Sequence, residues 1–206
     1  MKRTAFCTVA WLLFCTALSA AEDPPLFEDR FEGKLGEGWT WIRENPDAWR
    51  IAEGALEICV EPGLAATVKN ALVREAPDRS KGKFAFEVTV ANTTRPIRQF
   101  EQAGLTLYHE GKPVFKLVKE LIGGELYIIP GKVPMGSTKV QLRLIVSADS
   151  FTAQFRPDAK GEFKTAATGR LPAPGKDQIS VQCYHGPPDA EHWIRFDDFR
   201  ILKLPD

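Results

Sequence analysis

The sequence has few of the residues and motifs from which metal, redox and nucleotide sites are built. Its three histidines, His109, His185 and His192, lack the close spacing of metal ligands, and we expect them at the surface. No GxSxG, phosphate-loop or dinucleotide-binding motif occurs, so the usual signatures of α/β-hydrolases, nucleotide hydrolases and Rossmann enzymes are missing. The sequence also has no excess of positive or negative charge, because 27 basic side chains balance 27 acidic ones. This balance argues against nucleic acid or an anionic membrane surface as a partner.

Long apolar runs are confined to the start of the chain. The run Ala5–Leu18 follows Lys2 and Arg3 and precedes small residues, a pattern typical of a secretory signal peptide at residues 1–21. The run is too short for a transmembrane helix, so we expect no membrane span and a secreted or periplasmic protein. Without this segment the chain keeps 25 basic and 27 acidic residues, and residues 22–206 have the length of a single domain.

Two of the four cysteines, Cys7 and Cys15, lie in the predicted signal peptide. Export would permit a disulfide between the other two, Cys59 and Cys183. Cys183 shares a face with Ile179 and Val181, the apolar side of its strand, whereas Cys59 is out of step with its own apolar neighbours, so the two cysteines are expected to face different ways. The pattern therefore favours two small buried thiols. A disulfide between them stays open as the alternative.

Helical periodicity is also missing from the mature chain, and alternation of apolar and polar residues replaces it. The clearest case is Phe100–Glu120, which predicts a β-hairpin in the middle of the chain. A three-residue loop, Glu110-Gly111-Lys112, places Leu107 opposite Phe115 and Leu105 opposite Leu117, whereas two- or four-residue loops would place Leu105 opposite Lys116. We therefore predict the first register, which puts Gln102 beside Glu120 and Thr106 beside Lys116 on the other face.

The next turn supports this register. Gly123-Gly124 suits a tight turn with two positive φ angles, and it places Glu120 opposite Tyr127. Gln102, Glu120 and Tyr127 would then form one row on the face that points away from the core. Further strands are predicted at Leu26–Phe31, Trp39–Ile42, Trp49–Ala52, Ala55–Val60, Asn70–Arg74, Lys83–Ala91, Val140–Val146, Phe151–Phe155, Gln178–Tyr184 and Trp193–Leu202, the last with a bulge at Asp197-Asp198. The fold class is all-β, with two antiparallel sheets packed as a jelly-roll sandwich.

The non-core face of the central hairpin is the predicted ligand-binding surface. Amides, carboxylates and arginines suit sugar hydroxyl groups, and tyrosine and tryptophan rings stack on sugar rings. An ordinary solvated sheet face is the alternative, and we expect most of the tryptophans in the core, with Trp41 the best exception. The predicted ligand-binding residues are Gln102, Tyr108, Lys116, Glu120, Tyr127, Arg143 and Trp41.

Two further groups of carboxylates are weaker candidates. Glu120 with Glu87 or Glu101 would serve as an acid/base pair if the two carboxyl groups lay at the spacing of a glycosidase, although Glu101 is expected on the other face. Asp29, Asp197 and Asp198 would meet if the first and last strands lie side by side, and they would suit a structural calcium ion. Turn and bulge chemistry, with ion pairs to neighbouring arginines, is the alternative for these aspartates.

Several segments occur in an order that resembles a known superfamily. They are LFEDRFEG, WTWIRENPDAWRI, GALEI, NALVRE, EQAGLTLYHEGKPVFKL and RFDDFRIL. Together, from Leu26 to Leu202, they look like the concanavalin A-like lectin/glucanase superfamily. Within it they are similar to a bacterial domain family of unknown function related to the C-terminal accessory β-sandwich of β-xylosidases. The resemblance implies a jelly roll with a concave sheet in a superfamily that often handles carbohydrate.

The resemblance does not extend to a catalyst. The superfamily's glucanases carry Glu-x-Asp followed closely by a second Glu on one strand, and FEVTV contains Glu87 alone. We therefore expect a secreted carbohydrate-binding or accessory domain without catalysis of its own. One alternative is an enzyme acting on a glycan or 3-keto-glycoside with Glu120 or Glu87, and another is a structural or protein-interaction domain. The oligomeric state stays open.

Overall fold

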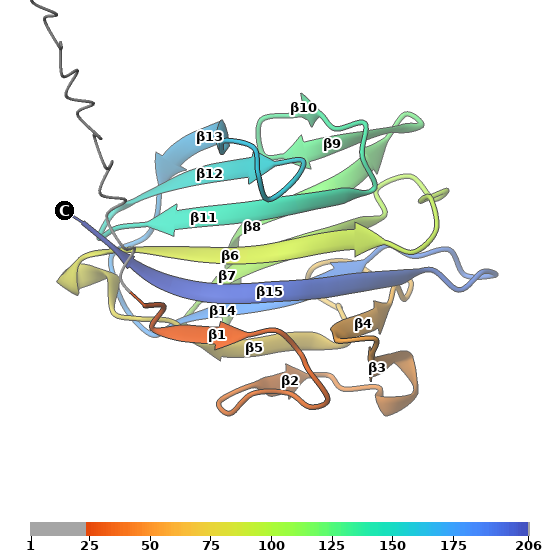
Figure 1. Ribbon diagram of the computed structural model, residues 1–206, viewed down its shortest axis with the longest axis horizontal. Helices are drawn as coiled ribbons and strands as arrows, with labels where there is room; N and C mark the ends of the chain where they lie inside the picture. The colour runs from red at the N-terminus through yellow and green to blue at the C-terminus, as the bar shows by residue number, and fades with distance from the viewer. Residues whose placement is uncertain (1–23, 206) are drawn as a thin grey trace, which may run out of the picture.

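The computed structural model describes residues 24–205, which form two antiparallel β-sheets packed face to face. Sheet A lies in front of sheet B in Figure 1. The predicted signal peptide, residues 1–21, lies outside the described residues. Sheet A contains β13 (Lys164–Arg170), β12 (Ser150–Arg156), β11 (Lys139–Val146), β6 (Lys83–Asn92), β15 (Trp193–Leu204), β4 (Ala55–Cys59) and β3 (Trp49–Ala52) in that order, with β1 (Phe27–Asp29) paired to β15. Sheet B contains β10 (Val133–Pro134), β9 (Glu125–Ile129), β8 (Lys112–Ile122), β7 (Gln102–His109), β14 (Asp177–Tyr184), β5 (Ala71–Glu75) and β2 (Thr40–Ile42).

This arrangement confirms the predicted all-β jelly-roll sandwich. Neighbouring strands in each sheet are often far apart in sequence, as β6 and β15 are, so the chain crosses repeatedly between the sheets. Two short 3₁₀ helices, Pro46–Ala48 and Arg79–Lys81, complete the secondary structure of the described part. Among residues 24–205, no helix has the length and apolar character needed to cross a membrane.

The inner faces of the two sheets form the core, because alternate side chains of each strand point between them. Phe86 and Val88 of β6 face this layer from sheet A, and Leu105 and Leu117 face it from sheet B, all with no exposed surface. Burying side chains of this size contributes about 1.5–3 kcal/mol each. The alternation that predicted the strands is therefore the alternation that fills the core.

The central hairpin has the predicted register, but its turn differs. Leu107 lies opposite Phe115, Leu105 opposite Leu117, and Gln102 opposite Glu120. The predicted three-residue loop is wrong, because β7 and β8 are joined by a two-residue turn, Glu110-Gly111, with both φ angles positive. A bulge between Leu107 and Tyr108 restores the register by accommodating one extra residue of β8.

The other predicted pairings are also present. Glu120 lies opposite Tyr127 across the Gly123-Gly124 turn, whose two glycines have positive φ angles. A register shift between Asp197 and Arg200 confirms the predicted bulge in β15, and β1 lies beside β15 as expected. Strand β13 was not predicted, because its sequence KTAATGR has no alternating bulky residues.

Candidate functional site

The outer face of sheet B brings four polar or aromatic side chains into one row. Pairing across β14, β7, β8 and β9 aligns Tyr184, Gln102, Glu120 and Tyr127. Thr106 and Lys116 lie opposite each other on the same face of β7 and β8. We call this surface the polar face and define it by Gln102, Thr106, Lys116, Glu120, Tyr127 and Tyr184.

Lys116 organises the centre of the polar face. Its ammonium group donates to Gln102 Oε1 at 2.6 Å and to Glu120 Oε2 at 3.0 Å. Gln102 is held in turn, because its Nε2 donates to Phe100 O at 2.8 Å. Glu120 is 6% exposed, and a buried carboxylate is stable only with such a cationic partner. The sequence prediction that these three residues share a face is confirmed by their contacts.

The chain segment between β4 and β5 covers one side of this face. Ala65 and Val68 pack against Tyr108 and Tyr184, which are 3% and 5% exposed. Burial raises the pKa of Tyr108, and burial together with the nearby carboxylate of Glu120 raises that of Tyr184 far above its ordinary value. Both phenols therefore stay protonated and can donate hydrogen bonds at neutral pH. Tyr108 already does so, to Gln182 Oε1 at 2.9 Å.

A hollow of about 210 Å³ lies between this segment and the start of β8. It is lined by Ala65, Thr106, Pro113, Val114, Phe115, Lys116 and Tyr184. Within the described part of the chain, the buried hydroxyl of Thr106 and the buried amide nitrogen of Gln182 have no hydrogen-bond partner. Buried polar atoms nearly always have partners, so the unpartnered hydroxyl in the hollow wall indicates a place where a ligand or water binds.

The structure places Arg143 on the opposite side of the sandwich from the polar face, so its assignment to the same surface is wrong. Arg143 lies on β11 of sheet A, where it forms an ion pair with Glu87 and stacks over Phe163 at 3.7 Å. The strand pattern could show that Arg143 faces outward, but it could not show in which sheet β11 lies. Its outward direction was predicted correctly and its sheet was not.

Trp41 does not lie on the polar face either. It pairs with Leu72, whose side chain belongs to the core, and it packs against the core from the edge strand β2. Its ring lies 4.8 Å from that of Trp49, between ring centroids. The expectation that most tryptophans belong to the core therefore extends to Trp41.

The proposed acid/base pairs do not form. Glu87 lies on the outer face of sheet A and Glu120 on the outer face of sheet B, with the core between them. Glu101 is 1% exposed and binds His192 Nδ1, with oxygen–nitrogen distances of 2.9 and 3.0 Å. His192 is itself 7% exposed, so its predicted surface position is wrong. Glu120 is left as the one carboxylate among the residues that define the polar face.

The aspartates proposed for calcium have other partners. Asp29 Oδ1 accepts from the backbone of Phe31, and Oδ2 accepts from Gly36 N and from Trp39 Nε1. Asp197 accepts from the backbone of Asp198 at the bulge. Between residues 24 and 205, no group of three or more His, Cys, Asp or Glu side chains has a metal-binding arrangement. The turn and bulge alternative fits these contacts.

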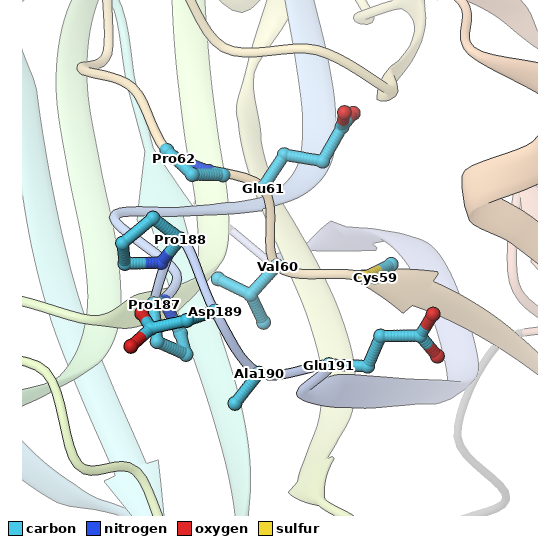
Figure 2. Close-up of a pocket in the computed structure, with 9 residues that line it drawn as sticks. All are labelled: Cys59, Val60, Glu61, Pro62, Pro187, Pro188, Asp189, Ala190 and Glu191. Carbon is cyan, nitrogen blue, oxygen red and sulfur yellow. The ribbon is translucent and has the colours of Figure 1, made fainter.

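A second hollow, of about 410 Å³, lies beside Cys59 (Figure 2). Residues 59–62 and 187–191 line it, and the carboxylates of Glu61, Asp189 and Glu191 point in different directions. Burial and the neighbouring Glu191 and Glu61 raise the pKa of the Cys59 thiol, which disfavours the nucleophilic thiolate. Cys59 and Cys183 are both free thiols in the described structure, but only Cys183 is buried and Cys59 is half-buried, so the prediction of two buried thiols holds for Cys183 alone.

Tyr184 and Thr106 belong to the polar face but were missing from the predicted site residues. Thr106 was already placed beside Lys116, and Tyr184 follows directly from alternation with Val181 and Cys183 on the apolar side of β14. The pairing of β14 with β7 carries the missing information, because it brings Tyr184 opposite Gln102. No local sequence signal specifies that pairing.

Several solved structures have the same fold as this chain. The GH43 protein BlXynB from Bacillus licheniformis superimposes with a TM-score of 0.70 at 16% identity, over 86% of this chain and 39% of that one. The xylan beta-1,4-xylosidase from Bacillus halodurans C-125 gives 0.64 at 15%, over 88% and 40%. Alginate lyase AlgAT5 from Polysaccharide Lyase family 7 gives 0.58 at 9%, over 82% and 95%. The chain thus spans about two fifths of the length of the two Bacillus proteins.

Sequence comparisons add no closer relative. No protein-family model matches the chain, and none of the curated proteins matches its sequence. At identities of 9–16% the structural likeness shows the fold alone. By fold, the chain is a jelly-roll sandwich of two antiparallel sheets, as these solved structures are.

Proposed function

We propose that the protein binds carbohydrate through the polar face and that this face performs no catalysis of its own. The single observation that carries the proposal is the unpartnered hydroxyl of Thr106 in the wall of the hollow beside Lys116. Hydroxyl groups of a sugar both donate and accept hydrogen bonds. They would therefore pair with the Thr106 hydroxyl and with the unused donors and acceptors of Lys116 and Glu120.

Two further observations support a glycan as the ligand. Solved structures of the same fold include a xylan beta-1,4-xylosidase and an alginate lyase, and those activities are known for those proteins. The polar face also carries Tyr127 beside Glu120, where an aromatic ring would stack on a sugar ring. Export through the predicted signal peptide would place such a domain where polysaccharides occur.

Glu120 lacks the second carboxylate that a catalytic role in glycoside hydrolysis would require on the polar face. Acid/base hydrolysis of a glycoside needs two carboxyl groups about 5–10 Å apart. Glu87, the partner considered from the sequence, lies on the opposite outer face. Binding without hydrolysis is therefore the function that the polar face supports best.

A glycan array probed with the full mature protein tests the proposal, followed by calorimetry on the best-bound oligosaccharide. We expect Gln102→Ala to weaken binding about tenfold, because Lys116 loses one of its two acceptors. Gln154→Ala is the matched control, since it removes the same side chain from the outer face of sheet A. Binding of no glycan by the wild type would overturn the proposal, and so would equal losses in the two variants.

A further inference from the structure

The polar face offers both hydrogen-bond donors and hydrogen-bond acceptors to a ligand. Glu120 accepts from Lys116 through Oε2, which leaves Oε1 as a second acceptor. Tyr184 lies near this carboxylate and stays protonated, so its hydroxyl is a donor there. Thr106, opposite Lys116, can both donate and accept. A ligand that fits must therefore present donors and acceptors together.

The charges of the polar face already cancel. The ammonium of Lys116 lies 3.0 Å from Glu120, and Gln102 accepts a second of its three N–H groups. The hollow is lined by Lys116 and not by Glu120, whose carboxylate lies 3.0 Å from the ammonium and is 6% exposed. An anion that approached Lys116 would therefore also approach a desolvated carboxylate whose counter-ion is already engaged. Like charges brought together in this way are disfavoured.

Two other cations near the face, Lys132 and Arg43, are engaged with other groups. Lys132 lies over the ring of Tyr127, at 5.7 Å from the centroid, on the edge of sheet B and two strands from Thr106. Arg43 donates through Nε to Val68 O, within the covering segment. Neither is positioned to replace Lys116 as the partner of an anionic group bound beside Thr106.

We infer that the polar face selects an uncharged glycan over a uronate-containing one, with Glu120 as the specificity-determining residue. This inference rests on the proposed carbohydrate binding and adds the class of sugar. In the bound state, a ligand hydroxyl in the hollow contacts Thr106 and Lys116, and a neighbouring hydroxyl outside the hollow donates to Glu120 Oε1. A uronate carboxylate at the same place offers acceptors alone and repels Glu120.

Calorimetry with the mature protein tests the inference on two matched sets of oligosaccharides. Neutral xylo- and gluco-oligosaccharides form one set, and galacturonate and alginate oligosaccharides of equal length form the other. We expect the neutral set to bind at least tenfold more tightly. Glu120→Gln should weaken neutral binding several-fold and reduce the ratio between the sets, because the amide removes the repulsion.

Two controls keep the outcomes distinct. Glu28→Gln makes the same change on the outer face of sheet A and should leave both affinities unchanged, and thermal unfolding of each variant reports whether it is folded. Tighter binding of the uronate set by the wild type would overturn the inference while carbohydrate binding stood. An unchanged ratio in a folded Glu120→Gln variant would overturn it as well. Binding of neither set would overturn the proposed function itself.

Discussion

The outer faces of the two sheets are built on opposite principles. On sheet A, one row across five strands contains Gln154, Arg143, Glu87, Arg200 and Glu28, so charges of opposite sign alternate. Each of its carboxylates contacts an arginine. On sheet B, the corresponding row contains tyrosines, an amide and one carboxylate, and a hydroxyl nearby has no partner among the described residues.

The difference between the two outer faces is that polar groups pair with one another on sheet A and remain partly unpaired on sheet B. The ion pairs of sheet A satisfy one another, and the hollow of about 430 Å³ above them is lined by the paired side chains of Glu28, Glu87, Arg143 and Arg200. Sheet B leaves hydrogen-bonding capacity unused in a hollow, which costs stability unless something binds there. The comparison therefore predicts that substitutions on sheet A change stability and substitutions on the polar face change binding.

The largest expected effect is on sheet A. Glu87 is 2% exposed and paired with Arg143, so Glu87→Ala leaves a partly buried guanidinium without its carboxylate. We expect the free energy of unfolding to fall by about 3 kcal/mol in urea denaturation, with glycan affinity unchanged. Glu28→Ala, which breaks a more exposed pair, should cost less than about 1 kcal/mol. A loss of binding in the folded Glu87→Ala protein would break the comparison.

The next effect concerns the inner side of sheet B. Lys119 is 2% exposed, its ammonium donates to Thr138 O, and burial lowers its pKa to about 7. The unfolded chain keeps the ordinary pKa near 10.5, so between these values unfolding takes up a proton. The free energy of unfolding should therefore rise with pH above 7, by up to about 1.4 kcal/mol per unit, and the destabilisation is fully present below pH 7.

Lys119→Met removes this titration. We expect the variant to be more stable than the wild type by about 2 kcal/mol at pH 6, with the difference falling through zero before pH 9 as the wild type gains stability. Denaturation of both proteins across this range measures the difference, and subtracting one curve from the other cancels the titration of the cysteines and tyrosines. A difference independent of pH would show that Lys119 stays charged in the folded protein.

A smaller effect is expected at the hollow, where one substitution should raise the stability of the protein and lower its affinity for a glycan. Thr106→Val replaces an unpartnered hydroxyl by a methyl group, which should stabilise the free protein by about 1 kcal/mol. The same change should weaken glycan binding about fivefold, since the ligand loses a hydrogen-bonding partner. Thr89→Val, on the outer face of sheet A, is the matched control for affinity. Unchanged affinity in Thr106→Val would remove this hydroxyl from the binding site.

The smallest effect is expected at the edge of the polar face. Tyr127 is half-buried beside Glu120, with Lys132 over its ring. Tyr127→Ala should weaken binding about threefold through lost stacking, and Tyr127→Phe should keep most of the affinity. Equal affinities of the alanine variant and the wild type would restrict the site to the hollow.

Much of the local structure could be predicted from alternation. The register of the central hairpin followed from placing Leu105 opposite Leu117, because a one-residue slip would have moved an entire set of apolar side chains out of the core. The turn itself was predicted wrongly, because a bulge near Tyr108 and a two-residue turn give the same pairing beyond them as a longer loop. Hydrophobic pattern constrains which residues face each other and constrains the path of the turn much less.

The sequence by itself determined which side chains point inward or outward on the strongly alternating strands, and the apolar pairing of the hairpin together with the Gly123-Gly124 turn determined the row Gln102, Glu120 and Tyr127. Only the tertiary structure decided which outward-facing strands share a sheet. It placed Arg143 and Glu87 on the far side of the sandwich, and it brought Tyr184 beside Gln102. The physical reason is that alternation is a local property of one strand, whereas pairing between strands distant in sequence depends on how two whole sheets pack around one core.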